Sequence, residues 1–101
     1  MNTNKTMREI LDSEAKSRTK IEVRIIDPEN PKHTDTFGGK KYERYNQNEL
    51  RARVGDVEVL SYSHGKWLYD NGEPMRLYIE VAEGTCERVY NGANGYQLCA
   101  I

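Results

Sequence analysis

The residues best suited to holding an anion occur in one short stretch, residues 36–46 (TFGGKKYERYN). Glycines followed by lysines can bind phosphate, because backbone amides and ammonium groups both reach its oxygens. A phosphate loop of the Walker type needs GxxxxGKS or GxxxxGKT before a helix, and this stretch lacks that spacing and the hydroxyl. We therefore expect an edge strand that lysines protect from edge-to-edge pairing. The alternative is a basic contact to a phosphate or an acidic partner through Lys40, Lys41 and Arg44.

Cysteine and histidine are the other residue types here that could bind a metal or catalyse a reaction. Structural zinc sites place cysteines two to four residues apart, whereas Cys86 and Cys99 are thirteen apart. We therefore expect no metal and no cofactor. His64 lies near Glu58 in the sequence and could work in acid–base chemistry, but no nucleophile motif or ligand cluster accompanies it. The sequence favours a protein that is not an enzyme.

The length, charge and hydropathy of the chain indicate how many domains it forms and where it is located. A chain of 101 residues predicts a single domain, residues 1–101. Residues 1–53 carry twelve Lys and Arg against nine Asp and Glu, and residues 54–101 carry three against seven. The polar residues 1–5 precede no apolar segment, and no run approaches the roughly 20 apolar residues of a membrane span. We therefore expect a cytoplasmic protein that does not enter a membrane.

A helix is expected near the start of the chain. Thr6 and Glu9 have the spacing of a capping box, and apolar residues recur behind them at helical intervals, which predicts a helix over residues 7–17. Residues 21–25 then alternate apolar and charged side chains, as in a half-buried strand. Since the helix has a single apolar stripe, we expect it to pack on a sheet.

The rest of the chain reads as a series of hairpins. Further strands are expected at residues 41–45, 50–54, 57–63, 66–69, 75–81, 86–90 and 96–99. Turns are indicated at Gly55-Asp56, His64-Gly65 and Asn71-Gly72. A last loop centred on Gly92-Ala93 would set Cys86 opposite Cys99, as free thiols or as a disulfide. Together these patterns predict an α+β fold, in which one N-terminal helix packs on a twisted, mostly antiparallel sheet of five to seven strands.

Two different sheet faces follow from this register. The aliphatic face forms the expected core, from Leu50, Ala52, Val54, Val57, Val59, Leu68, Met75, Leu77, Ile79 and Val81. The other face is aromatic and cationic, with Leu60, Tyr62, Trp67, Tyr69, Tyr78, Arg51, Arg53 and Arg76. Because Tyr, Trp and Arg are enriched at binding hot spots, the predicted partner-binding patch is Tyr62, Trp67, Tyr69, Arg76 and Tyr78. The alternative is a second core layer, covered by residues 27–45 or by closure of the sheet into a barrel.

The chain also resembles small orphan proteins of phages and conjugative elements, a population that includes anti-CRISPR and other anti-defence proteins. Its length, short capped helix and charged strands, with LYDNGEPMRLYIEV at residues 68–81, carry this resemblance. It implies a non-enzymatic protein that binds and blocks a host defence protein, as a monomer or an edge-strand dimer. The second hypothesis is a single-stranded nucleic-acid-binding domain that uses the same aromatic and arginine face. The acidic C-terminal half disfavours that second hypothesis.

Overall fold

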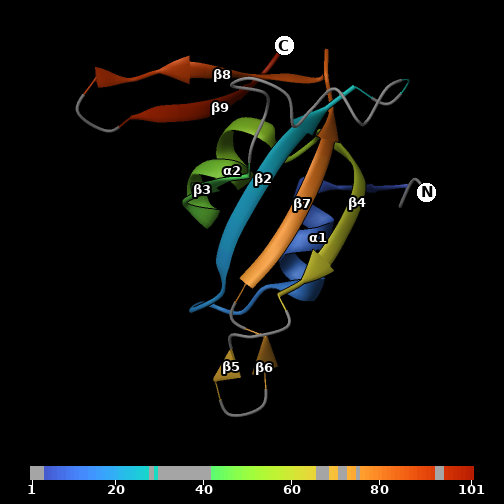
Figure 1. Cartoon of the computed structure of the whole chain (residues 1–101), viewed down its shortest axis with the longest axis vertical. Helices are drawn as coiled ribbons and strands as arrows, with labels where there is room; N and C mark the ends of the chain where they lie inside the picture. The colour runs from blue at the N-terminus through green and yellow to red at the C-terminus, as the bar shows by residue number, and fades with distance from the viewer. Residues whose placement is uncertain are drawn as a thin grey trace.

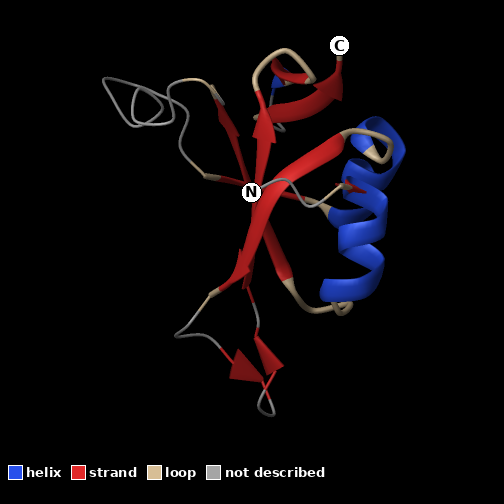
Figure 2. Ribbon diagram, turned by 90° about the vertical axis from the view of Figure 1, so that its right-hand side faces the viewer, coloured by secondary structure: helices blue, strands red, loops and turns tan. Residues whose placement is uncertain are grey.

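The computed structural model describes residues 4–27, 29, 42–65, 69–70, 73–74, 76–92 and 95–101. In chain order the elements are β1 (Lys5–Thr6), α1 (Met7–Glu14), β2 (Lys20–Ile26), β3 (Glu43–Tyr45), α2 (Gln47–Val54), β4 (Glu58–His64), β5 (Tyr69–Asp70), β6 (Glu73–Pro74), β7 (Arg76–Ala82), β8 (Cys86–Tyr90) and β9 (Tyr96–Ala100). They form a five-stranded sheet and two smaller sheets of two strands each (Figure 1). Both helices lie on one face of the large sheet (Figure 2).

The first helix forms as its capping box predicts. The Thr6 hydroxyl accepts a hydrogen bond from the Glu9 amide at 3.3 Å, and the Thr6 amide donates to the Glu9 carboxylate at 3.0 Å. Met7, Ile10 and Leu11 are fully buried against the sheet. The helix ends at Glu14, three residues before the expected end. The side chains that cover the core therefore come from its first two turns.

Residues 50–54 are not a strand but the second half of α2, so the predicted hairpin at Gly55-Asp56 is wrong. Asn46 caps this helix, because its side chain accepts from the amides of Asn48 and Glu49. Leu50 and Val54 are buried four residues apart, a spacing that fits a helix as well as a strand. The fold therefore has two helices where the sequence predicted one.

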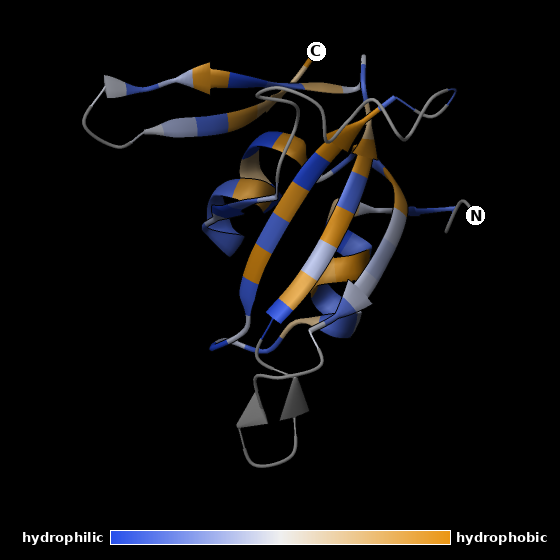
Figure 3. Cartoon of the chain, in the orientation of Figure 1, coloured by the Kyte–Doolittle hydropathy of each residue, from blue (hydrophilic) through white to orange (hydrophobic). Residues whose placement is uncertain are grey.

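The large sheet has the strand order β1-β4-β7-β2-β3. Its central pair, β2 and β7, is parallel, and the other three pairs are antiparallel. The predicted strand at residues 21–25 is confirmed, and its apolar residues pair with those of β7, as in Val23 with Ile79. Figure 3 shows the alternation of apolar and polar residues along both strands. The mostly antiparallel α+β architecture expected from the sequence is thereby observed.

A β-bulge interrupts the pairing of β4 with β7. Val59 pairs with Val81, but the register then shifts, so that Ser61 pairs with Glu80 and Tyr62 with Ile79. The expected hairpin of residues 57–63 with residues 66–69 is wrong, because β4 pairs with β7, and Tyr69 pairs with Pro74 in the small β5–β6 hairpin. Trp67, which was expected in the second of these strands, lies outside the described residues.

The β5–β6 hairpin has the register that the sequence indicates, whereas the register of the β8–β9 hairpin differs by one residue from the expected one. Asp70 pairs with Glu73, the register that an Asn71-Gly72 turn predicts, although that dipeptide lies outside the described residues. In the last hairpin Cys86 pairs with Ala100 and Glu87 pairs with Cys99. The two cysteines are therefore not opposite one another, and both are free thiols.

The core lies between the helices and the large sheet. It contains most of the predicted aliphatic positions: Leu50, Val54, Val57, Val59, Leu77, Ile79 and Val81. Ala52 was expected there but is exposed, because it lies on the outer side of α2. Leu68 and Met75 lie outside the residues whose side chains are described. The aliphatic core is thus shared by two helices and the sheet.

Candidate functional site

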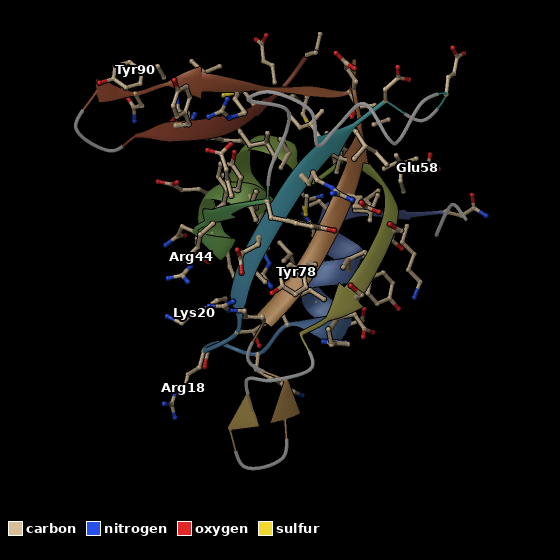
Figure 4. The ribbon with its side chains drawn as sticks, in the orientation of Figure 1. Arg18, Lys20, Arg44, Glu58, Tyr78 and Tyr90 are labelled. Carbon is tan, nitrogen blue, oxygen red and sulfur yellow. The ribbon has the colours of Figure 1, made fainter. Side chains whose placement is uncertain are left out.

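The sheet face opposite the helices, which Figure 2 shows uncovered by them, carries polar and aromatic side chains, Tyr78 among them (Figure 4). We call this the open sheet face; its residues are Glu22, Arg24, Arg76, Tyr78 and Glu80, which alternate with buried positions along β2 and β7, and Ser61 and Ser63, which pair with Glu80 and Tyr78. Tyr42 packs edge-on against Tyr78, with ring centroids 5.0 Å apart. The guanidinium of Arg24 lies over the Tyr42 ring, 4.6 Å from its centroid. These aromatic rings therefore already have partners within the chain.

The charges of the open sheet face are also paired with one another. The Glu80 carboxylate accepts from the Ser61 hydroxyl at 2.5 Å and from Arg24 Nε at 3.1 Å. Burial opposes ionisation of Glu80, but these hydrogen bonds lower its pKa below the usual value. Glu22 lies 3.6 Å from Arg76 Nε. Since acidic and basic groups alternate here, this face does not present the basic surface that nucleic acid requires.

The structure does not bring the predicted partner-binding patch together. Tyr78 and Arg76 lie on the open sheet face, whereas Tyr62 packs against the core on the helix side. Tyr69 belongs to β5, outside the large sheet, and nothing is described of Trp67. The prediction that Tyr62 and Tyr78 share one face is wrong, because the bulge in β4 reverses the alternation before Tyr62.

The predicted basic contact is only partly described. Arg44 lies in β3 and is exposed, and β3 is an edge strand of the large sheet, as expected. Arg44 lines a pocket whose lining also includes Lys16, Lys20 and Arg51. Lys40 and Lys41 lie outside the described residues. The cations that gather around Arg44 therefore come from distant parts of the sequence.

The β8–β9 ribbon carries an aromatic cluster that the sequence patterns did not indicate. Tyr90 and Tyr96 are 68% and 46% exposed, and their rings pack edge-on with centroids 5.5 Å apart. The guanidinium of Arg88 lies over the Tyr96 ring, 4.0 Å from its centroid, and Arg88 Nη2 donates to Glu43 Oε2 at 3.0 Å. We call Arg88, Tyr90 and Tyr96 the ribbon tip. In the sequence these three residues look like ordinary strand positions. Only the pairing of β8 with β9 shows that they form a cluster.

His64 is paired with a helix rather than with the carboxylates near it in the sequence. Its Nε2 lies 3.0 Å from Glu14 Oε1, at the C-terminal end of α1. The hydrogen bond to His64 holds the pKa of Glu14 below its usual value. This contact ties α1 to β4. Within the described ranges, no three or more His, Cys, Asp or Glu side chains gather to hold a metal ion.

Comparison with known proteins found no matching family model, curated protein or solved structure. Neither helix in the described part of the chain is long and apolar enough to span a bilayer. The function must therefore be inferred from the side chains themselves. Three surfaces stand out among the described residues: the open sheet face, the ribbon tip and the pocket beside Arg44.

Proposed function

We propose that the protein is a non-enzymatic binding protein whose ribbon tip contacts a partner protein. The observation that carries this proposal is the pair of exposed tyrosines, Tyr90 and Tyr96, packed together beside Arg88. Tyrosine and arginine are among the residue types that dominate binding hot spots. On the open sheet face, by contrast, Arg76 and Tyr78 are only partly exposed.

The ribbon tip is also organised before any partner arrives. Arg88 is held between the Tyr96 ring and the Glu43 carboxylate of β3, so the ribbon is connected to the large sheet. Binding costs less when side chains are already ordered, because immobilising each one costs about 0.5–1.5 kcal/mol. Figure 4 shows Tyr90 at the far end of the ribbon, where a partner can approach it.

The resemblance to anti-defence proteins indicates which partner to test first, a host defence protein. Edge-strand dimerisation through β3 remains compatible with this proposal, because β3 is at the edge of its sheet. The nucleic-acid hypothesis has less support, because Arg24 and Arg76 on the open sheet face lie beside Glu80 and Glu22.

A capture experiment with matched variants tests the proposal. The tagged protein is incubated with lysate of a candidate bacterial host, with and without nuclease treatment, and the captured protein is purified and titrated against each variant. The Tyr90→Ala/Tyr96→Ala double variant should weaken binding by about 2 kcal/mol or more, roughly 30-fold. Tyr78→Ala, which removes a tyrosine from the open sheet face, is the control and should bind as the wild type does.

Two results would argue against this function. Equal binding by the double variant and the wild type would exclude the ribbon tip as the contact surface. Loss of all capture after nuclease treatment, together with steep weakening by salt, would favour the nucleic-acid hypothesis instead.

A further inference from the structure

A pocket of about 560 Å³ opens beside the edge strand β3. Its walls are the connection from α1 to β2, strand β3 and the first turn of α2. Pockets of about 300–1,000 Å³ are the size that small molecules occupy in proteins. The ribbon tip contributes no residue to this lining, so the pocket is separate from the proposed partner-binding surface.

The charged residues that line this pocket all have the same sign. Lys16, Lys20, Arg44 and Arg51 line it, and no Asp or Glu does. Arg51 lies 3.1 Å from Asp12, which holds its side chain at the pocket wall. Arg44 is directly opposite Glu22 on β2, and no ion pair between a carboxylate and Lys16, Lys20 or Arg44 is described. We call this site the cationic pocket.

The cations line one pocket although they come from two separate segments, residues 16–20 and 44–51. Figure 4 shows Lys20 and Arg44 projecting from the same edge of the molecule, with Arg18 next to them. Concave surfaces lined by one sign of charge focus the electrostatic potential and raise the local concentration of counter-ions. An anion is therefore attracted to this concavity.

The frame of the cationic pocket is fixed by hydrogen bonds. The Lys16 amide donates to the Thr19 hydroxyl at 2.9 Å, and the Gln47 side chain donates to the carbonyls of Lys16 and Thr19 at 2.8 and 2.9 Å. These bonds tie the start of β2 to the start of α2. Burial raises the pKa of Tyr45 to about 12, and its neutral phenol adds no charge to the pocket.

We propose that the cationic pocket binds the phosphate groups of a small phosphorylated ligand of nucleotide size. A phosphate carries more than one negative charge and several acceptor oxygens, which suits several converging cations better than a single carboxylate does. Arg44 can donate two parallel hydrogen bonds to such a group, while Lys16 and Lys20 act as mobile point charges. Tyr45, Ala15 and Ile21 supply less polar wall for the rest of the ligand.

Calorimetric titration with three probes tests this proposal: ADP, inorganic pyrophosphate and adenosine. ADP and pyrophosphate should bind in low salt, whereas adenosine, which has no phosphate, should not. Equal affinity for ADP and pyrophosphate would assign recognition to the phosphates alone, and tighter binding of ADP would add a contact to the nucleoside. Both results support a phosphate site, and the comparison shows whether the ligand is recognised by its phosphates alone or also by its nucleoside.

Matched charge variants locate the binding. Arg44→Gln and Lys20→Gln should each weaken ADP binding about tenfold, the loss expected for one charge-assisted contact. Arg53→Gln removes an equal charge from an exposed part of α2 outside the lining and should leave ADP binding unchanged. All three positions are on the surface, so thermal melts should show that each variant is folded.

Three outcomes would overturn the proposal. The first is no binding of ADP or pyrophosphate at millimolar concentration. The second is an equal effect of Arg44→Gln and Arg53→Gln, which would indicate attraction by overall charge and not by the pocket. The third is tighter binding of a single-stranded oligonucleotide than of ADP, with the same sensitivity to Arg44→Gln, which would assign these cations to a nucleic-acid backbone.

Discussion

Tyr62 and Tyr78 lie on opposite faces of the central sheet, because a bulge separates Val59 from Ser61 in β4. Tyr62 pairs with the buried Ile79 and packs against the core, whereas Tyr78 is directly opposite Ser63 on the open sheet face. A bulge adds one residue to one strand, so every later side chain changes face. Two tyrosines that alternation assigns to one surface therefore have different roles.

This difference predicts unequal effects on stability. Tyr62→Ala removes a half-buried ring that contacts the core, so we expect a loss of about 2 kcal/mol, or roughly 10 °C in Tm for a domain of this size. Tyr78→Ala removes an edge-on contact with Tyr42, worth about 1 kcal/mol. Thermal unfolding of both variants measures the difference. If Tyr78→Ala were the more destabilising of the two, Tyr62 would not belong to the core side.

The sequence could predict those elements whose pattern fits a single periodicity. The Thr6–Glu9 capping box has a specific spacing, and the alternation in β2 is unbroken, so both were identified correctly. The Asn71-Gly72 dipeptide predicts the register that Asp70 and Glu73 show. Each of these features depends on neighbouring residues alone, which explains why local rules suffice.

The second helix could not be distinguished from a strand in this way. Leu50 and Val54 are four residues apart, so they share a face in either conformation, and Ala52 between them is compatible with both. The distinguishing residue is Asn46, a strong N-cap that lies outside the predicted strand. Sequence patterns of neighbouring residues could not predict the cationic pocket either, because residues 15–21 and 44–51 come together only through the pairing of β2 with β3.

The turn after α2 leaves no room for a larger residue at Gly55. A Cβ atom there would overlap the carbonyl oxygen of Arg51 and the guanidinium of Arg8. Gly55 has φ −58° and ψ −30°, so alanine could adopt this backbone and would gain about 0.4–1 kcal/mol from the unfolded state. We expect the overlap to cost about 1–3 kcal/mol, which makes Gly55→Ala destabilising overall.

Urea unfolding of Gly55→Ala beside Asp56→Ala checks this expectation. Asp56 forms an ion pair with Arg8 at 2.6 Å, but its side chain is 90% exposed, so its removal should change stability by less than about 1 kcal/mol. A Gly55→Ala variant as stable as the wild type would show that Arg8 and the turn can move aside.

The Glu14–His64 contact predicts a loss of stability in acid. The hydrogen bond from His64 lowers the pKa of Glu14 below 4.5 in the folded chain. A depressed carboxyl pKa contributes stability above the unfolded value, and this contribution is lost as the pH falls through the folded pKa. Between about pH 5 and pH 3, the wild type should therefore lose more stability than Glu14→Gln does.

Urea unfolding at several pH values measures this difference. Glu87→Gln, which removes an exposed carboxylate from β8, is the control and should follow the wild-type curve. If Glu14→Gln also followed the wild-type curve, the hydrogen bond between α1 and β4 would make no contribution to folding.

The two cysteines should differ in reactivity and should not form a disulfide in the folded protein. Cys86 pairs with Ala100, and Cys99 pairs with Glu87, so the two thiols are on opposite faces of the ribbon. Burial raises the pKa of Cys86, which is only 3% exposed, while Cys99 is half-buried. Because the thiolate is the reactive form, we expect Cys99 to react with a thiol reagent about tenfold faster or more.

Labelling Cys86→Ser, which keeps the fast thiol, and Cys99→Ser, which keeps the slow one, separates the two rates. In denaturant both variants should react alike, and equal rates in the folded state, or rapid air oxidation to a disulfide without unfolding, would contradict the register of β8 with β9.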